Sequence, residues 1–146
     1  MLSSDWVNDY DFSSLSQTLV VENLETFRFL HRQCCNTLLI FGGGWKVAQL
    51  VGFHERLPST FFYWGDIDKE GYEIVGYLME RIPDVRPVLM GLSTVGEYKH
   101  LSVRKEEYYG PFKNLGSLQK TYELVCREGV LIEQEKIPTD QLPFKI

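Results

Sequence analysis

Hydrophobic residues along this chain form short unbroken runs, separated by longer segments in which they recur every three or four positions. An unbroken run is typical of a strand buried on both faces, whereas the wider spacing is typical of a helix with one apolar side. The runs predict strands at residues 18–22, 36–41, 60–64 and 85–91, and the segments between them predict helices at residues 23–33, 45–54 and 68–82.

Two of these helices have a clear apolar side. The first is expected to begin at Asn23 as its N-cap and to turn its large apolar residues towards the sheet, namely Leu24, Phe27, Leu30 and, alongside them, Phe29. The third should bury five residues and end near Pro83; the five are Ile74, Val75, Leu78, Met79 and Ile82.

Strands and helices therefore alternate from residue 18 to residue 91, which predicts an α/β fold: a parallel four-stranded sheet with helices on both faces and right-handed crossovers. After Gly91 the pattern changes, and a helical C-terminal extension is expected from about residue 92. One helix there has an apolar stripe that Gly129 should end, formed by Leu115, Leu118, Tyr122 and Val125. Residues 1–16 are mostly polar and predict an N-terminal tail, which leaves residues 17–146 as the domain.

Acidic residues follow two of the predicted strands. Glu22 ends the first, and Asp66 and Asp68 come directly after the third. Because ligands of an open α/β sheet bind beyond the carboxyl ends of its strands, these side chains are expected to meet at one edge. Carboxylate oxygens are preferred ligands of Mg²⁺ and Mn²⁺, and one carboxylate can serve as general base or acid. The alternative is structural, with Asp68 as a helix N-cap and Asp66 as a turn residue.

Three weaker signals lie elsewhere. The sequence FGGGW at residues 41–45 lacks the G-K-[ST] of a phosphate-binding loop and predicts a tight turn, although Lys46 beside it is a possible contact for a DNA phosphate. Glu133 and Glu135 alternate in a short extended segment. They predict either a solvated face or a supporting contact near the acidic site.

Composition narrows the function classes. The chain has 146 residues, is 44% hydrophobic and carries a net charge of -5, which suits one domain and argues against a free-standing nucleic-acid binder. A metal-binding enzyme can still be acidic, because its cations reverse the local charge. The three cysteines have no disulfide or zinc spacing and predict reduced thiols. No apolar run approaches the ~20 residues of a membrane span and no signal peptide is evident, so a cytoplasmic protein is expected.

A glutamate after strand one and D-x-D after strand three resemble the Toprim pattern of topoisomerases, primases and related nucleases. The string 66–74 fits D-x-D-x-x-G-x-x-I and is similar to the A subunit of topoisomerase VI. Five segments in order (VVENLETF, FGGGW, YWGDIDKEGYEI, RPVLM and LIEQEKIP) resemble the C-terminal Toprim domain of JetD, the D subunit of the Wadjet system, roughly over residues 18–138.

This resemblance implies a DNA nuclease within a bacterial anti-plasmid defence complex. Glu22, Asp66 and Asp68 match the Toprim acids and would bind Mg²⁺ or Mn²⁺, with Glu22 as general acid or base. The implied partners are plasmid DNA, SMC-type motor subunits and a second copy in a homodimer, with no membrane. No tyrosine stands in a context that suggests a covalent nucleophile, which favours hydrolysis by water.

Two departures keep other functions open. Relatives of this kind carry further N-terminal domains, so the chain is expected to be a fragment or a stand-alone relative. An acid is expected after strand four, where this chain has Gly91. A non-catalytic Toprim module that binds DNA or partners is therefore the main alternative, and a phosphoryl-transfer enzyme acting on a small substrate is a third.

Overall fold

The computed structural model describes residues 11–146 and is built around a four-stranded parallel sheet. The strands are β1 (Gln17–Val21), β2 (Thr37–Phe41), β3 (Phe61–Trp64) and β4 (Arg86–Pro87), and their order in the sheet is β2-β1-β3-β4. The predicted α/β architecture is confirmed, and it is consistent with a Toprim-like fold.

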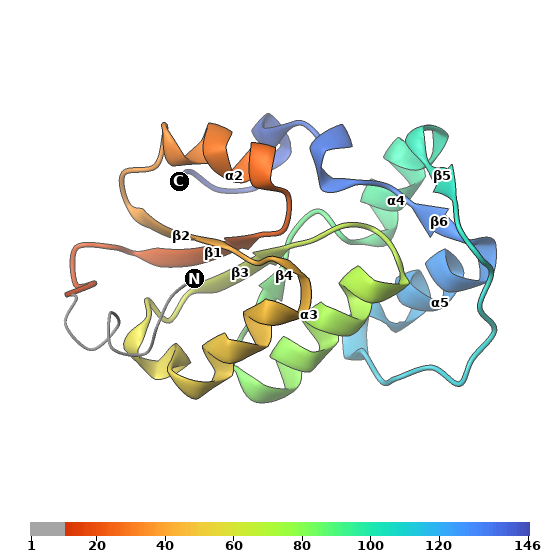
Figure 1. Ribbon diagram of the computed structural model, residues 1–146, viewed down its shortest axis with the longest axis horizontal. Coiled ribbons are helices and arrows are strands. Elements are labelled where there is room, and N and C mark those ends of the chain that lie inside the picture. Colours follow the sequence, from red (N-terminus) through yellow and green to blue (C-terminus); the bar gives the residue numbers. More distant parts are fainter. Residues whose placement is uncertain (1–10) are drawn as a thin grey trace.

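Helices cover both faces of this sheet (Figure 1). The helix α2 (Leu24–His31) lies on one face, while the 3-10 helix η1 (Gly44–Gly52) and the helix α3 (Lys69–Arg81) pack together on the other. A second 3-10 helix, η2 (His54–Arg56), follows η1 and leads into β3.

The core lies between these layers. All four residues of β3 are buried, and the inward residues predicted for α3 are buried except for Met79, which is half-buried. Phe12 also belongs to the core although it precedes β1, and residues 1–10 of the predicted tail lie outside the described residues. Across the described residues, none of the helices has the length and apolar character that a membrane crossing requires.

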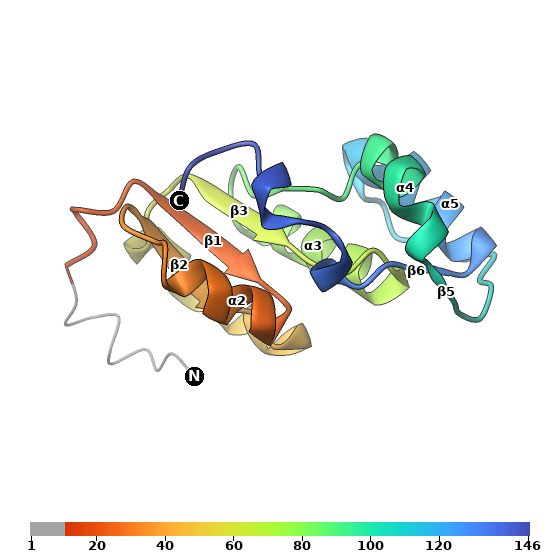
Figure 2. The same cartoon turned by 90° about the horizontal axis from the view of Figure 1, so that it is seen from above.

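The C-terminal extension is helical, as predicted, but it also contains a small antiparallel strand pair. Its elements are α4 (Leu92–Tyr98), η3 (Lys99–Leu101), β5 (Val103–Arg104), η4 (Gly116–Leu118), α5 (Gln119–Glu128), β6 (Val130–Leu131), η5 (Gln134–Lys136) and η6 (Thr139–Gln141). The predicted apolar stripe is buried, and Gly129 ends α5 with a φ of 60°. Beyond β6 the chain returns past the end of β3 towards α2 (Figure 2).

Three expectations differ from the structure. The strand predicted at 85–91 is only two residues long, because Pro87 offers no N–H to a sheet and Leu89 takes a left-handed φ of 55° that turns the chain away. The helix predicted at 45–54 is a 3-10 helix. On α2, Leu24 and Phe29 are exposed, so the inward side of this short helix is narrower than predicted.

Candidate functional site

The three predicted acids lie at the carboxyl edge of two adjacent strands. Val21, the last residue of β1, pairs with Trp64, the last residue of β3. Glu22 follows the first of these strands, and its N–H donates to the Trp64 carbonyl at 3.2 Å. Asp66 and Asp68 follow the second. Segments more than 40 residues apart in the chain therefore present their acids at one edge of the sheet, as the strand-end rule predicts.

The Glu22 carboxylate is held by two donors. Its Oε2 accepts from the N–H of Gly44 at 2.7 Å, and its Oε1 accepts from the Tyr63 hydroxyl at 2.9 Å. Burial raises the pKa of Glu22, the two hydrogen bonds oppose this, and the nearby charges of Asp66 and Glu70 raise the pKa further. Two hydrogen bonds therefore stabilise the ionised form of Glu22 at a position where burial and neighbouring acids disfavour a negative charge.

The glycine turn after β2 is shaped around this carboxylate. Gly43 and Gly44 have φ angles of 64° and 69°, a region that residues with a Cβ seldom adopt. At Gly42 the backbone approaches Glu22 so closely that a Cβ would overlap its Oε1. The turn was predicted, but its role is more specific than helix packing, since it leaves room for the Glu22 side chain and directs a backbone N–H at it.

Asp66 is held from the C-terminal segment. Its Oδ1 accepts from the N–H of Gln134 at 2.8 Å. Burial is the largest cause that raises the pKa of Asp66, and the charges of Asp68, Glu133 and Glu135 add to it. The two glutamates named from the sequence therefore lie close enough to act on Asp66 electrostatically.

Asp68 combines the two roles that its position allows. Its Oδ1 accepts from the N–H of Gly71 at 2.7 Å, which makes Asp68 the N-cap of α3. Its other oxygen, Oδ2, lies 3.1 Å from the ammonium nitrogen of Lys105. The capping alternative is therefore realised, and the second oxygen is engaged by a cation of the chain itself.

Gly71 explains the spacing of the D-x-D-x-x-G string. A Cβ at this position would overlap the backbone oxygen of Asp66. We expect Gly71→Ala to lower the free energy of unfolding by about 1–3 kcal/mol, because a backbone atom must shift to make room. Thermal or urea unfolding measures this. Gly96→Ala is the matched control, since Gly96 is helical and has open space around it. This variant should be as stable as the wild type or more stable by up to ~1 kcal/mol. Equal losses of stability at both positions would contradict the close approach of Gly71 to the Asp66 backbone as the cause.

Gln134 was not identified from the sequence, yet it connects the parts of the site. It is fully buried, its Oε1 accepts from the N–H of Asn23 at 2.8 Å, and its Nε2 donates to the Trp64 carbonyl. Together with its backbone bond to Asp66, this residue fixes the ends of β1 and β3 relative to each other. The only signal in the sequence was its place between Glu133 and Glu135.

The remaining predicted residues have different positions. Glu135 accepts from the Asn23 side chain at 2.9 Å, and Glu133 is exposed at the start of η5. Lys46 instead lines a cavity of about 440 Å³ along β2, which Phe27 and Phe41 border.

A cleft of about 510 Å³ opens beside the first turn of α3. Residues from four segments line it, among them Trp45, Lys69, Glu70, Glu73, Lys105, Tyr108 and Val125. Its lysines are paired with carboxylates, since Lys69 lies 2.6 Å from Glu73 and Lys105 lies against Asp68. The cleft therefore carries charges of both signs at the side of the site where Asp68 lies.

The carboxylates fit a hard divalent cation by their donor chemistry. Burial raises the pKa of Glu22 and of Asp66, neighbouring acids raise both further, and the ammonium of Lys105 lies against Asp68, so a metal ion would stabilise the ionised carboxylates. Within residues 11–146, however, no three His, Cys, Asp or Glu side chains are grouped closely enough to hold an ion as they stand. The residues have the right chemistry, and side chains must move before an ion is bound.

The raised pKa values predict how stability depends on pH. Between the unfolded and folded pKa values the folded chain binds more protons, so the free energy of unfolding falls as the pH rises through this window. We expect Glu22→Gln and Asp66→Asn to raise Tm at neutral pH, with the gain disappearing towards about pH 4. Thermal unfolding across this range tests it, with the exposed Glu55→Gln as control. If either variant is less stable than the wild type at neutral pH, the prediction that these ionised carboxylates lower the stability of the fold is wrong.

Comparison with known proteins adds the family. The chain matches the family model described as "Wadjet protein JetD, C-terminal" over residues 5–145, a longer stretch than the motifs alone had indicated. No curated protein matches it. Because the match spans nearly all of the 146 residues, this chain belongs to the family of the C-terminal region of Wadjet protein JetD.

Proposed function

We propose that this chain is the metal-dependent DNA endonuclease domain of a plasmid-defence complex. The observation that carries the proposal is the grouping of three acids at the carboxyl edge of the sheet, where Asp68 is buried and Glu22 and Asp66 are half-buried, with pKa values that desolvation raises. Buried like charges cost stability, and such a cost is typical of functional sites. Membership of the JetD family supports plasmid DNA as the substrate, with SMC-type subunits and a second copy of the chain as partners.

Glu22, Asp66 and Asp68 would hold Mg²⁺ or Mn²⁺, which supplies charge stabilisation for the phosphodiester and activates water. Glu22 is suited to move a proton because burial raises its pKa towards the working range of a general acid or base. Burial also raises the pKa of Tyr63, so its hydroxyl stays protonated and orients Glu22 by donating to it. Gln134 positions Asp66 through its backbone N–H.

A second function has specific support. Glu22 and Asp68 each have both carboxylate oxygens engaged by donors of the chain, and Gly91 stands where an acid was expected. These features favour a Toprim module that binds DNA or partners without cutting. Gly91 caps α4, and a Cβ there would meet open space, so the fold itself does not require glycine at this position.

Cleavage of supercoiled plasmid separates the two functions. The wild-type chain with Mn²⁺ or Mg²⁺ should nick the plasmid, and Asp66→Asn and Asp68→Asn should not. Glu55→Gln, which changes the net charge equally at an exposed position, is the control and should retain cleavage. If the wild type leaves the plasmid intact with both metals, and also when the partner subunits are added, the non-catalytic module is the better account.

A further inference from the structure

Lys105 makes the ion pair at the predicted acids. Its Nζ lies 3.1 Å from Oδ2 of Asp68, while the other carboxylate oxygen is engaged by the N–H of Gly71. The Asp68 side chain is 9% exposed and that of Lys105 is 50% exposed. The buried carboxylate therefore has its Oδ2 covered by an ammonium group that is itself half-exposed to solvent.

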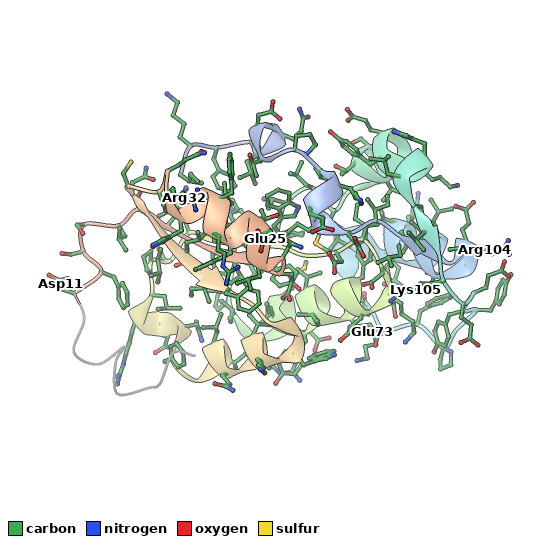
Figure 3. The ribbon with its side chains drawn as sticks, turned by 45° about the horizontal axis from the view of Figure 1, so that its top comes forward. Asp11, Glu25, Arg32, Glu73, Arg104 and Lys105 are labelled. Carbon is green, nitrogen blue, oxygen red and sulfur yellow. The ribbon has the colours of Figure 1, made fainter. Side chains whose placement is uncertain are left out.

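The backbone of Lys105 is fixed by the small strand pair. Its N–H donates to the Gly129 carbonyl at 2.7 Å, next to the pairing of Arg104 with Val130. A Cβ at Gly129 would overlap the Lys105 carbonyl, so the two segments approach closely. Figure 3 labels Lys105 beside the end of α3 where Asp68 forms the cap. Only the side chain of Lys105 has to move to release Asp68.

Other cations near the site are engaged elsewhere. Lys69 and Lys113 both pair with Glu73, at 2.6 and 3.5 Å. Among the described residues, Glu22 and Asp66 form no ion pair, and Lys105 is the one cation paired with any of the three acids. A divalent ion on Oδ2 of Asp68 would meet this ammonium at close range, where like charges repel strongly.

We infer that Lys105 is a built-in competitor for the divalent cation: its ammonium neutralises Asp68 in the metal-free site and must leave before an ion binds. This inference rests on the proposed metal site. Lys105 lines the cleft beside the first turn of α3, so the released ammonium has room to move into this space.

Calorimetric titration with Mn²⁺ alone tests the exchange. Lys105→Met keeps the length of the side chain and removes its charge, and it should bind Mn²⁺ about three- to five-fold more tightly, as expected for losing a half-exposed competing charge. Lys99→Met is the matched control, because Lys99 is also 50% exposed and pairs with Glu128 away from the acids. Its Mn²⁺ affinity should equal that of the wild type.

A second readout uses the unaltered chain. Mn²⁺ should raise the rate at which an acetylating reagent modifies Lys105, followed by peptide mass spectrometry, and leave the rate at Lys99 unchanged. An Mn²⁺ affinity of Lys105→Met equal to or below that of the wild type, or unchanged Lys105 acetylation, overturns the inference. If Asp68→Asn still abolishes Mn²⁺ binding in that case, the proposed metal site stands. If neither the wild type nor Lys105→Met binds Mn²⁺, both fail together.

Discussion

Replacing Glu22 by glutamine is expected to lower the rate of plasmid cleavage by roughly 10²–10⁴-fold, the range associated with loss of a general acid or base. Glutamine has nearly the same shape. Its amide oxygen can still accept from the N–H of Gly44, and its NH₂ group can donate to the Tyr63 hydroxyl oxygen. The folded structure should therefore be kept while the group that transfers the proton is lost. Cleavage rates at saturating Mn²⁺ measure the effect.

Two comparisons make this prediction sharp. Glu55→Gln removes an exposed acid and should cleave at the wild-type rate. The same Glu22→Gln protein should have a Tm at or above that of the wild type at neutral pH, because it loses a half-buried charge whose pKa desolvation raises. A variant that is equally stable and cleaves within a few-fold of the wild type would exclude Glu22 as the proton-transfer group.

Replacing Gln134 by methionine is expected to have the largest effect on stability. The side chain is fully buried, and its loss leaves the Asn23 N–H without a partner and removes one of the two donors to the Trp64 carbonyl, which keeps the N–H of Glu22. An orphaned donor costs about 1–3 kcal/mol and a lost hydrogen bond about 0.5–1.5 kcal/mol, so the free energy of unfolding should fall by about 2–4 kcal/mol. Mn²⁺ affinity should also fall 10–100-fold, as is typical when a residue that positions metal ligands is lost.

Urea unfolding and calorimetry measure the two effects separately. Gln141→Met is the matched control, since Gln141 is exposed and its side chain donates to the neighbouring Asp140 at the surface. It should change neither quantity. If Gln134→Met is destabilised but binds Mn²⁺ with unchanged affinity while folded, Gln134 supports the fold without positioning Asp66.

The sheet and its acidic edge could be predicted because both leave signals in local sequence. Unbroken apolar runs mark strands buried on both faces, and β1, β2 and β3 all lie within one residue of the predicted bounds. The strand-end rule then identified Glu22, Asp66 and Asp68 without any knowledge of distances. The end of the fourth strand was missed because a left-handed residue, Leu89, breaks a run that looks continuous by hydrophobicity.

The contacts that hold these acids could not be predicted in the same way. Gln134 and Lys105 reach the site from segments 68 and 37 residues away from the aspartates that they contact. The strands β5 and β6 that guide Lys105 are two residues long, too short to show any periodicity. Tyr63 lies within an apolar run, where nothing marks its hydroxyl as the partner of Glu22.

The glycine patterns predicted local conformation correctly but not its purpose. FGGGW at residues 41–45 predicted a turn, and D-x-D-x-x-G supported the family resemblance, but neither pattern showed what the missing side chains make room for. The structure gives the reason in each case: Gly42 admits the Glu22 carboxylate, and Gly71 admits the Asp66 backbone oxygen. Residues that appeared to serve local conformation are therefore also needed to place the acids.

Calorimetric titration of the wild-type chain and of Asp66→Asn with Mn²⁺ tests the central claim most directly, because it needs neither DNA nor partner subunits. We expect saturable Mn²⁺ binding by the wild type that Asp66→Asn abolishes, since asparagine can keep the hydrogen bond from Gln134 but loses the charge that binds the ion. The exposed Glu55→Gln, with the same change in net charge, should still bind. Binding of Mn²⁺ by Asp66→Asn with the wild-type affinity would contradict a metal site built on these acids.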